Sequence, residues 1–204
     1  MVKKLQALRA KKGFTLVELI VVIAIIGVLA AILVPTMMGM VTKSRVTSAN
    51  STASGLKDTV NTYIVNQDTV GHGIVRSTST VTVKITKATD SGAIAVSDYE
   101  SLLPGGGSCT WAAEFQSGLE DELTDQYTFK TMAAEVLIKN GQVIGVSYVA
   151  GATAVPSDDA PDETDFIAGS HTWSGSKDSQ VGVGAKSGMI IGTYPALAHK
   201  AAAT

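Results

Sequence analysis

Residues 11–35 read Lys-Lys-Gly-Phe-Thr-Leu-Val-Glu-Leu-Ile-Val-Val-Ile-Ala-Ile-Ile-Gly-Val-Leu-Ala-Ala-Ile-Leu-Val-Pro, and this stretch decides the fold of the N-terminal part of the chain. The apolar run from Phe14 to Val34 contains a single carboxylate, Glu18. At about 1.5 Å per residue, a helix of this length spans roughly 30 Å, the thickness of the bilayer's hydrocarbon core. A charge at mid-membrane costs about 2.5–3.5 kcal/mol, and less near the interface, so Glu18 predicts a functional site.

The charges flanking the apolar run predict its orientation in a membrane. The residues before it carry five basic side chains and no acidic one, whereas the thirty residues after Pro35 carry only Lys43, Arg45, Lys57 and Asp58. This asymmetry places the N-terminus in the cytoplasm and the remainder outside. A cleaved secretory signal would have a shorter apolar core followed by a small-x-small site. A plain signal anchor would explain the length and the charges, but neither Glu18 nor the Gly13–Phe14 junction.

The junction, the carboxylate and the proline together resemble a type IV prepilin, a family that includes the pseudopilins of type II secretion and competence systems. The resemblance covers about residues 1–65. It implies that a prepilin peptidase cuts between Gly13 and Phe14 and methylates the new Phe14 amine. It also implies that Glu18, the fifth residue after the cut, pairs with the Phe14 amine of a neighbouring subunit. Two charges in an apolar filament core are each costly alone and tolerable as a pair.

The resemblance also assigns roles to Gly27 and Pro35. Pro35 lacks an N–H and clashes with the preceding turn, so a bend is expected there. The segment between these residues can lose helicity in assembled filaments of the family. The implied partners are further copies of the chain in a helical homopolymer, the prepilin peptidase, the cytoplasmic membrane and, indirectly, the assembly platform and motor ATPases. The implied location is the cytoplasmic membrane before assembly and an extracellular pilus afterwards.

Three segments follow from this interpretation: a leader at 1–13, a transmembrane or filament-core helix at 14–36, and an extracellular globular domain at 37–204. Without the leader the chain has 16 − 5 = 11 Lys and Arg against 18 Asp and Glu, a formal charge of −7. No basic patch is present, so nucleic-acid binding is not predicted. Cys109 is the single cysteine, which excludes an intrachain disulfide; we expect it to be a buried small apolar residue.

The fold class predicted for the domain is α+β. One apolar stripe predicts a helix from about 37 to 66 that packs on an antiparallel sheet, while the hydrophobic half before it protrudes; the stripe comprises Val46, Ala49, Ala53, Leu56, Val60 and Tyr63/Ile64. Alternation over 80–87 predicts a strand. Short helices are expected at 97–103, with Ser97 as N-cap, and at 110–123.

Asn140-Gly141 predicts a hairpin with a type I′ turn between strands 131–139 and 142–150. In that register Ile138 faces Val143 and Leu137 faces Ile144. One face of the hairpin is expected on the long helix, and the other only partly covered. A further strand is predicted at 188–194, a long surface loop at 151–187 and a frayed tail at 198–204.

Two groups of residues were considered as metal sites. Asp158, Asp159, Asp162, Glu163 and Asp165 crowd one loop, where a calcium site is the alternative to a solvated acidic loop, but the spacing is not that of an EF-hand. His72, His171 and His199 fall in separate loops or the tail and are expected to be surface residues. Asn50-Ser51-Thr52 matches a glycosylation acceptor. No catalytic or cofactor-binding motif is present, so neither an enzyme nor a cofactor is predicted.

The resulting prediction is a structural subunit of a type IV pilus, with roles in adhesion, twitching motility or aggregation. The alternative is a pseudopilin of a type II secretion-like system. Which partner surface the pilus binds does not follow from the residues.

Overall fold

The computed structural model describes residues 14–89, 91–127, 131–157, 159–174, 181–183 and 187–200. The chain divides into two compact units, residues 1–42 and 43–204. The helix α2 (Leu16–Thr69) begins in the first unit and ends in the second. The predicted leader, residues 1–13, lies outside the described residues.

In the first unit, α2 is apolar on all sides. Every described side chain from Phe14 to Val41 is exposed, and most of the exposed large apolar side chains of the described chain lie here. The helix is long and apolar enough to cross a membrane, by length and composition. It continues through Pro35, next to which the Thr36 hydroxyl donates to the Leu33 carbonyl at 2.9 Å. A bend at Pro35 remains a prediction.

In the second unit, the predicted apolar stripe of α2 is confirmed. Its buried members are Ala49, Ala53, Leu56, Val60 and Ile64, and the helix ends three residues beyond the predicted 66. The helix approaches the sheet closely at Gly192, where an added Cβ would lie 2.2 Å from the Ala49 carbonyl carbon and oxygen. Beside it, Asn50 Oδ1 accepts the Thr193 N–H at 2.8 Å. The side chain of the glycosylation candidate Asn50 therefore has a role in packing the helix on the sheet.

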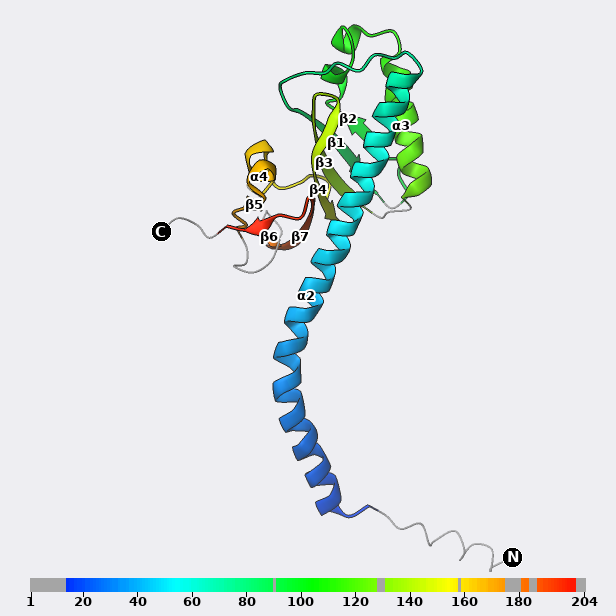
Figure 1. Ribbon diagram of the computed structural model, residues 1–204. Helices are drawn as coiled ribbons and strands as arrows, with labels where there is room; N and C mark the ends of the chain where they lie inside the picture. The colour runs from blue at the N-terminus through cyan, green and yellow to red at the C-terminus, as the bar shows by residue number, and fades with distance from the viewer. Residues whose placement is uncertain are drawn as a thin grey trace, which may run out of the picture. The chain divides into compact units, whose positions relative to one another are not determined.

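The second unit contains a six-stranded sheet in the order β2-β1-β3-β4-β7-β6 (Figure 1). All its neighbouring strands are antiparallel. The strands are β1 (Val81–Lys87), β2 (Ala95–Ser97), β3 (Met132–Lys139), β4 (Gln142–Ala150), β6 (Val181–Val183) and β7 (Ser187–Tyr194). The α+β class and the strands predicted at 80–87, 131–139, 142–150 and 188–194 are thus confirmed.

The hairpin turn is confirmed, but half of the predicted register is wrong. Asn140 and Gly141 have φ of 54° and 75°, as a type I′ turn requires. Ile138 pairs with Val143 as predicted, whereas Leu137 pairs with Gly145 because a bulge intervenes. An added Cβ on Gly145 would lie 2.4 Å from the Phe166 ring. The bulge therefore places a glycine where this ring packs on the strand.

The start of the helix predicted at 97–103 is also wrong. Ser97 ends strand β2, and only a 3₁₀ turn, η2 (Glu100–Leu102), follows. Val96 is buried and pairs with Ile85, so burial on the sheet outweighs the local capping signal. The second short helix is confirmed as α3 (Ala112–Gln126), which buries Phe115, Leu119 and Leu123. A further 3₁₀ turn, η3 (Gly106–Ser108), lies between them.

The second face of the sheet is partly covered, as expected: a second core covers it at β3, β4 and β7, whereas Lys84 of β1 and Ala95 and Ser97 of β2 are exposed. On one face, α2 and α3 pack over side chains such as Ile85, Val136 and Val146. On the other, a second core joins Leu137, Val149 and Ile191 to Phe166, Trp173 and Leu197. Figure 1 shows α2 and α3 on one side and α4 (Glu163–Ala168) on the other.

The described part of the segment 151–187 contains a helix in addition to isolated β segments, where only a long surface loop with isolated β segments is expected. It contains α4, the short strand β5 (Ser170–His171) and β6. In the predicted tail, β8 (Ala198–His199) pairs in parallel with β5, while residues 201–204 lie outside the described chain. Phe166 and Trp173 bury apolar area here, which local periodicity in a Gly- and Asp-rich segment does not reveal.

Candidate processing and assembly site

The N-terminal end of α2 presents the residues predicted for processing and assembly. Phe14 precedes the helix and is 83 % exposed, while Gly13 lies outside the described residues. The Thr15 carbonyl accepts the Leu19 N–H at 3.2 Å, the first α-helical bond. Glu18 lies in the first turn of the helix. The predicted junction is therefore next to an exposed helix start.

Thr15 and Glu18 form a capping box. The Glu18 N–H donates to Thr15 Oγ1 at 3.3 Å, and the Thr15 N–H donates to Glu18 Oε2 at 2.9 Å. The Thr15 hydroxyl adds a second bond to the same oxygen at 2.7 Å. Two backbone N–H groups that the helix leaves free are thus satisfied. The sequence reasoning missed this role, although Thr-x-x-Glu before an apolar run is its usual signature.

This geometry leaves part of the Glu18 carboxylate free. Both bonds from Thr15 end on Oε2, and within the described chain Oε1 accepts none. The carboxylate also lies at the positive end of the helix dipole, which favours its charge. A carboxylate oxygen with open lone pairs can accept an ammonium group from another molecule.

The two predicted helix-modulating residues lie in unbroken helix. Gly27 and Pro35 are both inside α2, and nothing lies within 4 Å of a Cβ added to Gly27. Gly27 therefore lowers helix propensity at an exposed position without a packing reason in this structure. Loss of helicity between the two residues in a filament remains a prediction.

The carboxylates of the acidic loop, for which a calcium site is the less favoured interpretation, have protein partners where they are described. Asp159 is fully buried and accepts the Ser174 N–H and hydroxyl at 2.8 and 2.7 Å. Asp162 is the N-cap of α4 in a second capping box, with Asp165 at the third helical position. The Thr164 hydroxyl and the Asp165 N–H donate to Asp162 and lower its pKa. Asp158 lies outside the described residues.

Glu163 and Asp165 are held in the same way. Glu163 accepts from Lys139 and from the Thr80 hydroxyl, and these bonds, that from Lys139 first, lower its pKa. Asp165 contacts the ring of His171. Across the described residues, no group of three or more His, Cys, Asp or Glu side chains is placed to hold a metal ion. The described carboxylates of the acidic loop accordingly cap α4 and bind neighbouring side chains.

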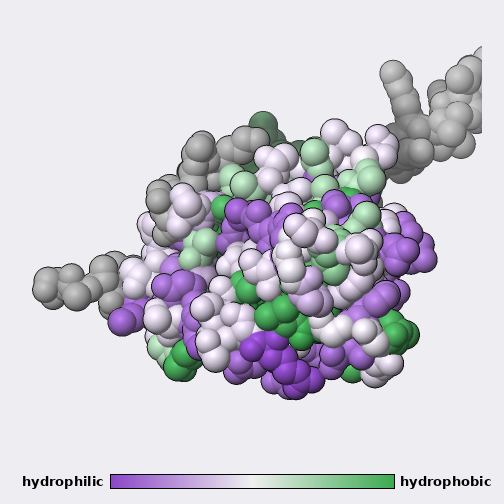
Figure 2. All heavy atoms as spheres, turned by 90° about the horizontal axis from the view of Figure 1, so that it is seen from above, coloured by the Kyte–Doolittle hydropathy of each residue, from purple (hydrophilic) through white to green (hydrophobic). Residues whose placement is uncertain are grey.

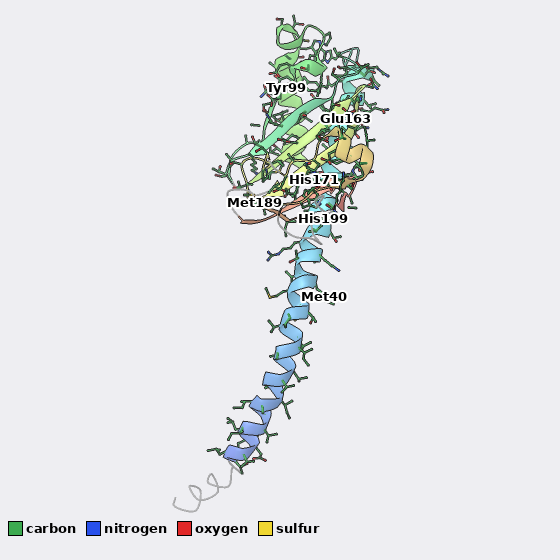
Figure 3. The ribbon with its side chains drawn as sticks, turned by 90° about the vertical axis from the view of Figure 1, so that its left-hand side faces the viewer. Met40, Tyr99, Glu163, His171, Met189 and His199 are labelled. Carbon is green, nitrogen blue, oxygen red and sulfur yellow. The ribbon has the colours of Figure 1, made fainter. Side chains whose placement is uncertain are left out.

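The histidines are less isolated than expected. His72 is half-buried, bonds Gln67 at 2.8 Å and stacks on Trp111 at 4.4 Å between ring centroids. His171 and His199 are register partners in β5 and β8 and are labelled in Figure 3 with Glu163. The expectation that the three lie in unrelated places is therefore wrong for the last two. Cys109, expected to be buried, is half-buried against the first core.

Comparison with known proteins identifies the N-terminal segment. Residues 8–34 match the family model described as the prokaryotic N-terminal methylation motif. A fimbrial protein of Moraxella nonliquefaciens is 39 % identical over 89 residues, which are 40 % of this chain and 55 % of that protein. A fimbrial protein of Pseudomonas aeruginosa is 45 % identical over 58 residues, 28 % of this chain and 38 % of that protein.

The type IV major pilin protein PilE of Neisseria gonorrhoeae is 38 % identical over 74 residues, 34 % of this chain and 44 % of that protein. The chain thus spans about half the length of these curated relatives, or less. No solved structure matches it. With its methylation motif, its N-terminal similarity to proteins named as pilins and its long N-terminal helix on an antiparallel sheet, the chain resembles the type IV pilins.

Proposed function

We propose that the chain is a structural subunit of a type IV pilus, cut between Gly13 and Phe14 by a prepilin peptidase and then assembled into a filament with copies of itself. The observation that carries this proposal is the first part of α2, up to Val41, which begins within the methylation motif and whose apolar side chains are exposed on every side. A helix that is apolar on every side is stable only inside a membrane or among other apolar helices. Cytoplasmic membrane and filament core supply these two surroundings in turn.

The globular unit contrasts with this helix and suits an outer layer. Its described exposed large apolar side chains are few and scattered: Val65, Val70, Val75, Ile167 and Tyr194. The face in Figure 2 shows apolar groups only in small separate patches among hydrophilic ones. Scattered apolar side chains are normal for a water-facing surface. In the proposed filament this unit faces the medium, where adhesion, motility or aggregation would involve it.

The geometry at Glu18 supports a specific assembly step. The carboxylate keeps its bonds to Thr15 through Oε2 while Oε1 stays open. A neighbour's methylated Phe14 amine can then bind Oε1 without uncapping the helix. In the apolar filament core this pairing neutralises two charges that would each be costly alone. The subunit therefore enters the filament with its first turn already formed.

Mass spectrometry of filaments sheared from the cell surface tests the proposal. The expected result is an abundant peptide that begins at N-methylated Phe14. Processed protein found only in membranes would instead favour a pseudopilin of a secretion system. A chain that still carries Gly13 would overturn processing and leave a plain membrane anchor.

A further inference from the structure

The globular unit brings two histidines from distant sequence positions into neighbouring strands. His171 in β5 and His199 in β8 are register partners of a parallel pair. The Ala198 N–H donates to the Gly169 carbonyl at 3.0 Å, and the Lys200 N–H donates to the His171 carbonyl at 2.8 Å. Register partners stand on the same side of a sheet, with strands about 4.8 Å apart. The two side chains, both labelled in Figure 3, therefore stand on the same side of this strand pair.

Each ring buries a nitrogen that has no hydrogen-bond partner. These atoms are His171 Nε2 and His199 Nδ1, and the His171 side chain is only 11 % exposed. Trp173 Nε1, in a ring whose centroid lies 4.5 Å from that of His171, is also buried and unpartnered. Buried polar atoms in native proteins nearly always have a partner. Unpartnered nitrogens on two imidazoles of one strand pair point to a shared ligand, whereas the Trp173 N–H is a donor and is no metal ligand.

The contact with Asp165 indicates which kind of ligand. His171 Nδ1 lies 2.8 Å from Asp165 Oδ2; in the tautomer whose Nδ1–H donates to this carboxylate, the lone pair is on Nε2. Asp165 is itself held, because its Oδ2 accepts the Asp162 N–H at 3.1 Å. Histidines that bind metals nearly always donate their other N–H to a carboxylate or carbonyl. The arrangement at His171 matches that pattern.

We propose that His171 Nε2 and His199 Nδ1 bind one divalent transition-metal ion of the Zn²⁺, Ni²⁺ or Cu²⁺ class, with Asp165 as a positioning residue. Imidazole nitrogens suit these ions, whereas Ca²⁺ and Mg²⁺ prefer oxygen ligands. Two protein ligands within the described residues leave the other coordination positions to water. The ion joins β8 to β5, so binding stabilises the folded C-terminal segment by mass action. This site is separate from the pilus-assembly residues and does not depend on the proposed function.

Calorimetric titration of the full chain in detergent, first stripped with EDTA, tests the site with ZnCl₂ as the probe. The expected result is one ion per chain. His171→Ala and His199→Ala should each weaken binding at least about tenfold, and Asp165→Asn by about tenfold as for other outer-sphere carboxylates. His72→Ala is the matched control, because His72 bonds Gln67 and stacks on Trp111; it should leave the affinity unchanged. Absence of stoichiometric binding by the wild-type chain would overturn the proposal.

Tryptophan fluorescence gives a second readout that does not depend on the stability of the histidine variants. Trp111→Phe leaves Trp173 as the only tryptophan of the chain. Because its ring is next to His171, one equivalent of CuCl₂ should quench its emission, and EDTA should restore it. Quenching that needs a large excess of copper, or that persists unchanged in His171→Gln or His199→Gln, would overturn the assignment.

Discussion

Glu18 and Thr15 each satisfy a backbone N–H of the other at the start of α2, at 2.9 and 3.3 Å. The residue proposed for assembly therefore has a second role in its own helix. An alanine at position 18 removes both roles at once, so that substitution cannot separate them.

Two variants separate capping from charge pairing. Glu18→Gln keeps an oxygen that can accept the Thr15 N–H but removes the charge, and we expect it to abolish filament assembly. Thr15→Ala removes the N-cap at a cost of about 0.5–2 kcal/mol to the first turn but keeps the carboxylate, so filaments should still form. The measurement is the amount of pilin sheared from cells relative to membrane pilin. Normal assembly of Glu18→Gln would contradict the pairing mechanism.

Gly192 is required for the approach of α2 to β7. An added Cβ would lie 2.2 Å from backbone atoms of Ala49, and backbone cannot move aside as a flexible side chain can. We expect Gly192→Ala to lower the free energy of unfolding by about 1–3 kcal/mol, the usual cost of overpacking. Gly73→Ala is the control, since nothing lies within 4 Å of its added Cβ. Equal urea midpoints for the two variants would rule out this close contact.

Leu56 anchors α2 in the first core. Its side chain is fully buried, so Leu56→Ala should lower the free energy of unfolding by about 2–5 kcal/mol through lost burial and a cavity. Val65 on the same helix is 49 % exposed, and Val65→Ala should change stability by less than about 0.5 kcal/mol. Chemical unfolding of both chains in detergent measures the difference. Similar losses would mean that the stripe does not face the sheet.

Glu135 and Glu163 should affect stability in opposite directions. Burial raises the pKa of Glu135 above its ordinary value of 4.5, so the folded chain binds this proton more tightly than the unfolded chain. Above about pH 4.5 the ionised Glu135 therefore destabilises the fold. Glu135→Gln should raise the free energy of unfolding at pH 7 and have a smaller effect at pH 4.

Hydrogen bonds, that from Lys139 first, lower the pKa of Glu163 below its ordinary value of 4.5. Its contribution is therefore present above that pH and is lost as the pH falls through the lowered pKa. Glu163→Gln should destabilise the chain at pH 7, making it the matched opposite of Glu135→Gln. Urea unfolding at several pH values measures both, and shifts of the same sign at pH 7 would contradict these assignments.

The sequence predicted best those elements whose signals are local. The apolar stripe of α2 and the Asn140-Gly141 turn need only helical periodicity and turn chemistry. The pairing of Leu137 with Gly145 depends instead on Phe166, which lies more than twenty residues further along the chain and packs over that glycine. Within the hairpin, Gly145 is the local signal, because an isolated glycine in a strand suggests a bulge or a close approach, but it does not say which residue approaches.

The acidic loop shows a different limit. Asp162 and Asp165 have the spacing of a capping box, yet the density of carboxylates favoured a calcium or solvent interpretation. Likewise, His171 and His199 lie far apart in sequence, and only the parallel pairing of β5 with β8 brings them together. Local capping could have been predicted from the residues, whereas the histidine pair could not.

The pairing of β5 with β8 also has a consequence for the redox chemistry of folding. It closes the C-terminal segment through backbone bonds at 3.0 and 2.8 Å, in a chain whose single cysteine cannot form an internal bridge. Reducing agents therefore find no internal disulfide to reduce in this chain, and its folding does not depend on enzymes that form disulfides. Folding of the globular unit therefore needs no thiol oxidase, whether its surroundings are reducing or oxidising.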